Sequence, residues 1–126
     1  LVEVLIVLAI LGILASIAIP RYETYVLRGN RAGDALPALN ELMQAQERFA
    51  AQNGTYTEEL KDLGYGDNPE TPGGNYNLDA TTCTGRAAIA ECVVVRALAK
   101  GSQTRDNNGD SGNITYSSRG EKTGLE

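Results

Sequence analysis

The first twenty residues constrain this chain more than any other stretch. They read LVEVLIVLAILGILASIAIP, and between Val4 and Ile19 no residue is charged and Ser16 carries the one polar side chain. As an α-helix, residues 1–19 would be roughly 28 Å long, which is close to the thickness of a bilayer's hydrocarbon core. This segment therefore needs lipid or an equally apolar protein environment.

One carboxylate, Glu3, lies near the start of this apolar run. An unpaired charge in such a helix costs about 2.5 to 3.5 kcal/mol at its middle and less near an end. A signal peptide is disfavoured, because residues 15–18 make a poor cleavage site. A plain transmembrane anchor explains the length of the segment but leaves Glu3 unexplained. An assembly helix packed against copies of itself explains both, so we expect Glu3 to find its cationic partner there.

Gly12, Ser16 and Pro20 occur in the apolar run at intervals of four residues. Small residues at this spacing allow neighbouring helices to approach closely, although Gly and Ser are also simply tolerated in apolar helices. Pro20 lacks a backbone donor and clashes with the preceding turn. We therefore predict a kink or local melting between Gly12 and Pro20.

Beyond Pro20 the sequence predicts that the helix resumes in amphipathic form and ends at Asn53-Gly54, a good C-terminal stop. Apolar residues recur at steps of three and four, namely Tyr22, Tyr25, Ala32, Ala35, Leu36, Leu39, Leu42, Met43, Phe49 and Ala50. A helix from Leu1 to about Gln52 would be roughly 78 Å long, which is too long for a globular domain of this size. Its N-terminal part must protrude.

The C-terminal half alternates in the manner of strands over residues 75–81, 87–99 and 113–118, after a short helix that Thr57 caps and Gly64 ends. Strands in sequence with turns between them favour an antiparallel meander. The predicted fold class is α+β: a long protruding N-terminal helix packed on a small antiparallel sheet of three strands, or of four. Two parts are expected, an apolar transmembrane or filament-core helix (1–27) and a globular head (28–126).

The overall composition narrows the possible functions. The chain has 126 residues, a net charge of −5 and no histidine, so a general nucleic-acid binder with a basic surface is disfavoured. We interpret Arg21, Arg28, Arg31 and Arg48 as solvated helix faces or lipid-headgroup anchors rather than a DNA-binding stripe. No nucleophile–base pair or phosphate loop is evident, so no enzyme activity and no cofactor are expected.

Two small groups of residues remain as candidate sites. Cys83 and Cys92 enclose an eight-residue loop, and we expect a structural disulfide in an oxidising compartment. Asp106, Asn108 and Asp110 have the alternating oxygen spacing of a calcium loop. That loop lacks the usual glycine and the final glutamate, so a solvated turn is the favoured interpretation and calcium the weaker alternative.

The stretch LVEVLIVLAILGILASIAIPRYETYV closely resembles the N-terminus of mature type IV pilins and of the pseudopilins of type II secretion. The patterns NGTYTEELKDLG and KGSQTRDNNG resemble the short-headed pilins and minor pilins of that group. The resemblance implies the pilin fold. Two residues, the first a methylated Phe, precede the position of Leu1 in that family. Glu3 then matches the glutamate that is thought to neutralise the α-amino group of a neighbouring subunit during assembly.

This resemblance also implies a function. We expect a structural subunit that is stored in the inner membrane with a periplasmic head and is polymerised into an extracellular filament on the bacterial surface. Such a filament serves adhesion, twitching motility or DNA uptake. Its partners would be copies of itself, minor pilins and the assembly machinery, and Glu3, Gly12 and Pro20 would be the assembly residues. A pseudopilin of a type II secretion system and a DNA-binding competence pilin are the alternatives, and calcium binding would favour the pseudopilin.

Overall fold

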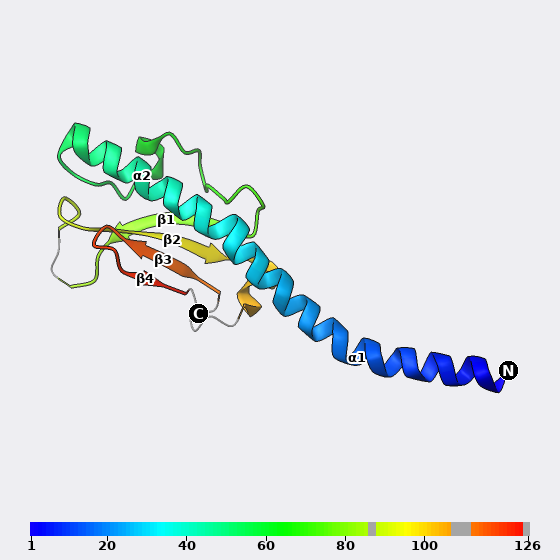
Figure 1. The fold of residues 1–126 in the computed structure, drawn as a ribbon. Coiled ribbons are helices and arrows are strands. Elements are labelled where there is room, and N and C mark those ends of the chain that lie inside the picture. Colours follow the sequence, from blue (N-terminus) through cyan, green and yellow to red (C-terminus); the bar gives the residue numbers. More distant parts are fainter. Residues whose placement is uncertain (86–87, 107–111, 125–126) are drawn as a thin grey trace.

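The computed structural model describes residues 1–85, 88–106 and 112–124, with only the backbone of residues 19–24. One helical rod runs from α1 (Val2–Asn30) through a π-helical turn, η1 (Arg31–Ala35), into α2 (Leu36–Asn53). Figure 1 shows the first part of α1 projecting away from the rest of the chain. The predicted protruding helix is confirmed, and it ends where Gly54 adopts a left-handed φ of 75°.

Four antiparallel strands form one sheet in the order β1-β2-β3-β4. They are β1 (Tyr76–Thr82), β2 (Val93–Ala99), β3 (Ile114–Ser117) and β4 (Lys122–Thr123). The meander is therefore confirmed in its four-stranded form. The second strand begins at Val93 rather than at residue 87. A turn in which the Cys92 N–H donates to the Ala88 carbonyl at 3.1 Å precedes it.

The core lies between α2 and one face of the sheet (Figure 1). Alternate strand residues point into it, as the period of two requires, and the side chains of α2 cover them. The largest fully buried apolar side chains are Leu39, Leu42, Tyr76, Val93, Val95 and Ile114. Met43 packs at the edge of this cluster and Phe49 is only half-buried, so the predicted helix–sheet contact is confirmed in its central part.

Two short 3-10 helices complete the head. The first, η2 (Leu60–Leu63), follows α2 and ends at Gly64, as predicted, although its first residue lies three positions after Thr57. The second, η3 (Gly101–Arg105), follows β2 and was not predicted. It lies beside the C-terminal end of α1 (Figure 1), where it contacts the helical rod.

Candidate functional site

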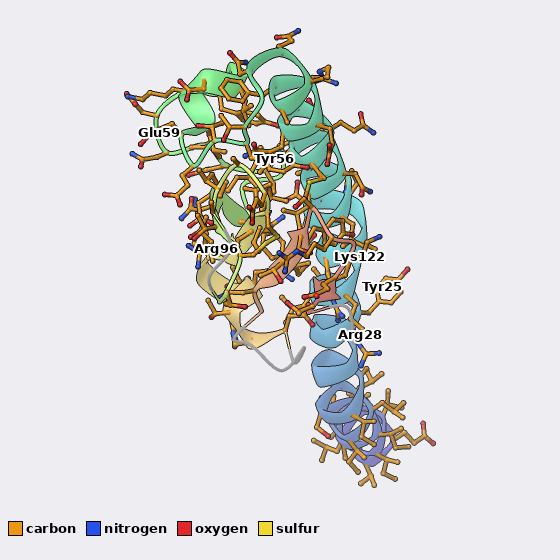
Figure 2. The ribbon with its side chains drawn as sticks, turned by 90° about the vertical axis from the view of Figure 1, so that its left-hand side faces the viewer. Tyr25, Arg28, Tyr56, Glu59, Arg96 and Lys122 are labelled. Carbon is orange, nitrogen blue, oxygen red and sulfur yellow. A yellow bond between two sulfur atoms is a disulfide. The ribbon has the colours of Figure 1, made fainter. Side chains whose placement is uncertain are left out.

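The apolar residues of α1 are exposed over residues 1–18 (Figure 2). Its large aliphatic side chains from Val2 to Ile17 are between 51% and 68% exposed. Contiguous apolar surface of this kind marks a site of interaction. We predicted a membrane span in residues 1–27. Among the residues that the structure describes, however, no helix combines the length and the apolarity that crossing a membrane requires.

The three predicted assembly residues all lie on α1. Glu3 is exposed in its first turn. A Cβ added at Gly12 would meet no atom within 4 Å, so nothing in the described chain requires a glycine at this position. We predicted a kink or local melting between Gly12 and Pro20. The helix continues through Pro20 without melting in the single chain, and the axis of α1 bends along its length (Figure 1). Their roles in assembly stay predictions.

The π-turn η1 joins α1 to the head and carries two charged side chains, each of which binds groups of the head. Arg31 is buried and forms an ion pair with Asp106, which follows η3. This position corrects our interpretation of Arg31 as part of a solvated helix face. Asp34 reaches the loop before β1, where Oδ1 accepts from the Gly73 N–H at 2.7 Å and Oδ2 from Asn75 Nδ2 at 3.1 Å. The turn is thus tied to the head on two sides.

The electrostatics of this joint follow from burial and hydrogen bonding. Burial acts to raise the pKa of Asp34, but the hydrogen bonds from Thr71, Gly73 and Asn75 outweigh it, so the pKa is lowered. Burial raises the pKa of Tyr76 to about 12, and the Asp106 carboxylate adds to the rise. Asp34 is therefore ionised and Tyr76 neutral at physiological pH.

The structure gives Asp106 a role that differs from the predicted one. Both of its carboxylate oxygens accept hydrogen bonds from Arg31, at 2.9 and 3.0 Å. These oxygens thereby form an ion pair with a guanidinium and are not directed to a metal ion. The other two candidate calcium ligands, Asn108 and Asp110, lie outside the described residues, and calcium binding stays the weaker alternative to a solvated turn.

The predicted disulfide between Cys83 and Cys92 is confirmed. Both cysteines are buried, and their Cα atoms are 5.6 Å apart. Cys83 directly follows the last residue of β1 and Cys92 directly precedes the first residue of β2. The bridge therefore closes the end of the β1–β2 hairpin, where the strands' own ladder stops.

A groove of 660 Å³ lies between α2 and the β3–β4 hairpin. Met43 and Arg48 line it from the helix, and Tyr116 and Lys122 line it from the hairpin. The Lys122 ammonium sits 4.7 Å from the centre of the Tyr116 ring, which is within the range of a cation–π interaction. This groove therefore offers exposed positive charge beside an aromatic ring.

Two groups of basic side chains can be distinguished among the described residues. Four basic residues form ion pairs: Arg31, Lys61, Arg96 and Lys100, with Asp106, Asp67, Asp79 and Glu70 in that order. In contrast, four exposed basic residues have no acidic partner in the described part of the chain, namely Arg28, Arg48, Arg119 and Lys122. Arg48 and Lys122 line the groove, and Arg119 adjoins its lining residue Gly120. Glu47 also lines the groove, and its carboxylate accepts a hydrogen bond from the Tyr56 hydroxyl at 3.1 Å. Two basic side chains and one acidic side chain therefore line the groove.

Reasoning from sequence missed the joint at η1. No residue type signals a π-turn, and the partner of Arg31 lies 75 positions away. One signal was present: Leu27, Arg31 and Ala35 follow one another at steps of four, on the buried side of the rod. An arginine in line with apolar positions predicts a buried, paired guanidinium rather than a solvated one.

Comparisons with known proteins agree with this architecture. Residues 20–115 match a family model described as "Type IV minor pilin ComP, DNA uptake sequence receptor". The type IV major pilin protein PilA of Myxococcus xanthus (strain DK1622) is 33% identical over 97 residues, which are 77% of this chain and 40% of that protein. The chain thus spans less than half the length of this relative. By its matched residues and its fold, the chain belongs to the type IV pilin family.

Proposed function

We propose that this chain is a structural subunit of an extracellular type IV pilus and that it polymerises through the first part of α1. The observation that carries the proposal is the exposed apolar surface of residues 1–18, which the head does not cover. Burial of apolar surface contributes about 25 cal/mol per Å², so packing these helices against one another would strongly favour assembly. Copies of the same chain provide an equally apolar and equally long surface.

Glu3 is the residue that we propose to set the register of this packing. A carboxylate among apolar helices stays charged only beside a cation, and a neighbouring subunit can supply one. The Glu3→Ala variant should therefore keep a folded head and lose filaments. Glu41→Ala, which removes an exposed acid from α2, is the matched control and should assemble normally. A normal filament yield from Glu3→Ala would contradict the assembly role.

A pseudopilin of a type II secretion system is the alternative within the same architecture. Both proteins would use α1 in the same way, so the filament itself discriminates between them. Electron microscopy of sheared surface material should show long filaments of this chain if it is a pilin. Their absence, together with firm calcium binding that Asn108→Ala and Asp110→Ala abolish, would favour the pseudopilin.

DNA uptake is a second candidate function, and the unpaired basic residues near the groove favour it. Arg48, Arg119 and Lys122 could contact phosphates, and the matching family model is described as a "DNA uptake sequence receptor". Each phosphate contact contributes about −0.9 to the slope of log K against log salt. Arg119→Ala and Lys122→Ala should each reduce the slope by about 1, whereas Lys61→Ala, which removes a paired ammonium, should not. Absent or salt-insensitive binding would exclude this candidate.

A further inference from the structure

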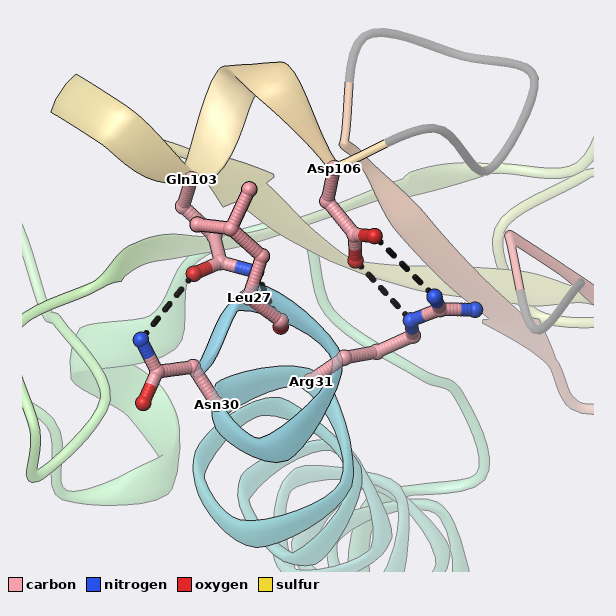
Figure 3. A network of polar contacts seen from close by, with 5 residues as sticks. All are labelled: Leu27, Asn30, Arg31, Gln103 and Asp106. Atoms are coloured by element: carbon pink, nitrogen blue, oxygen red, sulfur yellow. Dashed lines mark hydrogen bonds and ion pairs between the residues drawn. The ribbon is translucent and has the colours of Figure 1, made fainter. Parts of the chain in front are cut away.

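The place where the protruding helix meets the head carries a compact group of buried polar contacts (Figure 3). On the helix side are Leu27, Asn30 and Arg31, and on the head side are Gln103 and Asp106. The two head residues lie in and directly after the short 3-10 helix η3. These contacts belong neither to the exposed apolar surface of α1 nor to the groove, so neither of those features explains why they are present.

Gln103 binds the last turn of α1 at two points. Its Nε2 donates to the Leu27 carbonyl at 2.7 Å, and its Oε1 accepts from Asn30 Nδ2 at 3.2 Å. The Gln103 side chain is buried. Because one planar amide contacts both a backbone carbonyl and a neighbouring side chain, only one orientation of α1 satisfies both bonds.

The ion pair between Arg31 and Asp106 adds a second planar contact. Two parallel hydrogen bonds join them, from Arg31 Nε to Oδ2 at 2.9 Å and from Arg31 Nη2 to Oδ1 at 3.0 Å. The side chains are 8% and 3% exposed, so desolvation offsets much of the Coulomb attraction. A bidentate arginine–carboxylate pair nevertheless imposes a specific geometry. Its contribution here is therefore better understood as orientation than as net stability.

These contacts coincide with an irregular part of the helical rod. The π-turn η1 begins at Arg31, and π-turns are rare and often occur at functional sites. Asp34, in the same turn, is bound by the loop that precedes β1. The head therefore contacts the rod at the segment where its hydrogen bonding changes from α-helical to π-helical.

We propose that Gln103 and Asp106 clasp Leu27, Asn30 and Arg31 and thereby fix the direction in which α1 leaves the head. The five residues, which we call the clasp, are positioning residues for assembly. This proposal deepens the proposed function and rests on it where filaments are concerned, because a subunit with a fixed α1 direction presents its head to its neighbours in one orientation. The direction itself is a property of the single chain.

The test measures that direction in the full chain, kept as single molecules in detergent micelles. Nitroxide labels at Tyr25→Cys, on the exposed side of α1, and Asn77→Cys, on β1, report the distance between the helix and the sheet. The parent chain should give one narrow distance distribution. Arg31→Lys, which cannot form the bidentate pair, and Gln103→Leu, which removes both amide contacts, should each broaden the distribution and shift its mean.

Arg96→Lys is the matched control. Arg96 forms a similar two-point pair with Asp79, but on the outer face of the sheet, so this variant should leave the distribution narrow. Hydrogen exchange of the backbone amides in β1 and β2 reports whether the head is still folded, and it should stay slow in all variants. An unchanged distribution in both clasp variants, equal broadening in Arg96→Lys, or fast exchange throughout the strands would each overturn the clasp. The distance measurement uses single chains, so it tests the clasp independently of filament assembly. Failure of Glu3-dependent assembly would appear in the filament yield and not in the distance distribution.

Discussion

The side-chain amide of Gln46 pairs with the backbone of Thr57 in both directions. Gln46 Nε2 donates to the Thr57 carbonyl at 2.7 Å, and the Thr57 N–H donates to Gln46 Oε1 at 3.1 Å. Gln46 is completely buried and Thr57 almost so. One side chain of α2 therefore satisfies two backbone groups of the segment that follows the helix, and fixes where that segment crosses it.

Replacing Gln46 by leucine should destabilise the head. The substitution leaves the buried N–H and C=O of Thr57 without partners, and each such group costs roughly 1 to 3 kcal/mol. We expect the free energy of unfolding in urea to fall by about 2 to 6 kcal/mol. Gln44→Leu, an exposed position of the same helix, is the control and should change it little. An equal loss in both variants would show that the backbone pairing contributes nothing specific.

Much of the architecture follows from local patterns. The steps of three and four from Leu36 to Met43, with the Asn53-Gly54 stop, predicted α2, and the alternation around Val93–Val95 predicted the central strand. These patterns work because each residue's burial depends on the period of its own element. The exposed apolar face of α1 was equally visible, because an uninterrupted apolar run cannot be covered by so small and polar a head.

The joint could not be predicted in the same way. Arg31 and Asp106 are 75 positions apart, and a charged residue in a helix carries no sign of its distant partner. Asp106 was expected in a solvated turn, with a calcium loop as the weaker alternative because its local spacing fits one, yet tertiary packing places a guanidinium against both of its oxygens. The π-turn was missed because its residues, RAGDA, suit an ordinary α-helix equally well.

The contribution of Asp34 to stability should depend on pH. Its pKa is lowered in the folded chain, because its hydrogen bonds outweigh the effect of burial, and the unfolded value is about 3.9. The stabilisation is therefore complete above about pH 4 and is lost as the pH falls through the folded pKa. Asp34→Asn should be less stable than the parent at pH 6, with a smaller difference at pH 3.

Urea unfolding at the two pH values measures this difference for Asp34. Asp67→Asn is the control, since Asp67 is exposed and pairs with Lys61 on the surface. Surface pairs contribute roughly 0 to 1 kcal/mol. The free energy of unfolding of Asp67→Asn should therefore differ little from that of the parent chain at both pH values. If the difference in free energy of unfolding between Asp34→Asn and the parent chain stays constant from pH 6 to pH 3, the lowered pKa of Asp34 is contradicted.

Gly73 should be intolerant of even a methyl group. A Cβ at this position would lie 2.8 Å from Asp34 Oδ2 and 2.9 Å from its Cγ. The carboxylate must then move, and its hydrogen bond with the Gly73 N–H would be disturbed. We expect Gly73→Ala to lower the free energy of unfolding by about 1 to 3 kcal/mol. Gly66→Ala, where an added Cβ meets no atom within 4 Å, should have little effect. Equal effects would exclude a steric cause.

The disulfide should stabilise the head by closing the β1–β2 hairpin. Cys83 and Cys92 are nine positions apart, and the chain-entropy model gives about 2 to 3 kcal/mol for a loop of this size. Reduction of the full chain in detergent should therefore lower its Tm, and the Cys83→Ser/Cys92→Ser variant should show the lower Tm without reductant. Reductant should leave the Tm of that double variant unchanged, which separates the bridge from other effects of the reagent. An unchanged Tm after complete reduction of the parent chain would exclude a stabilising role.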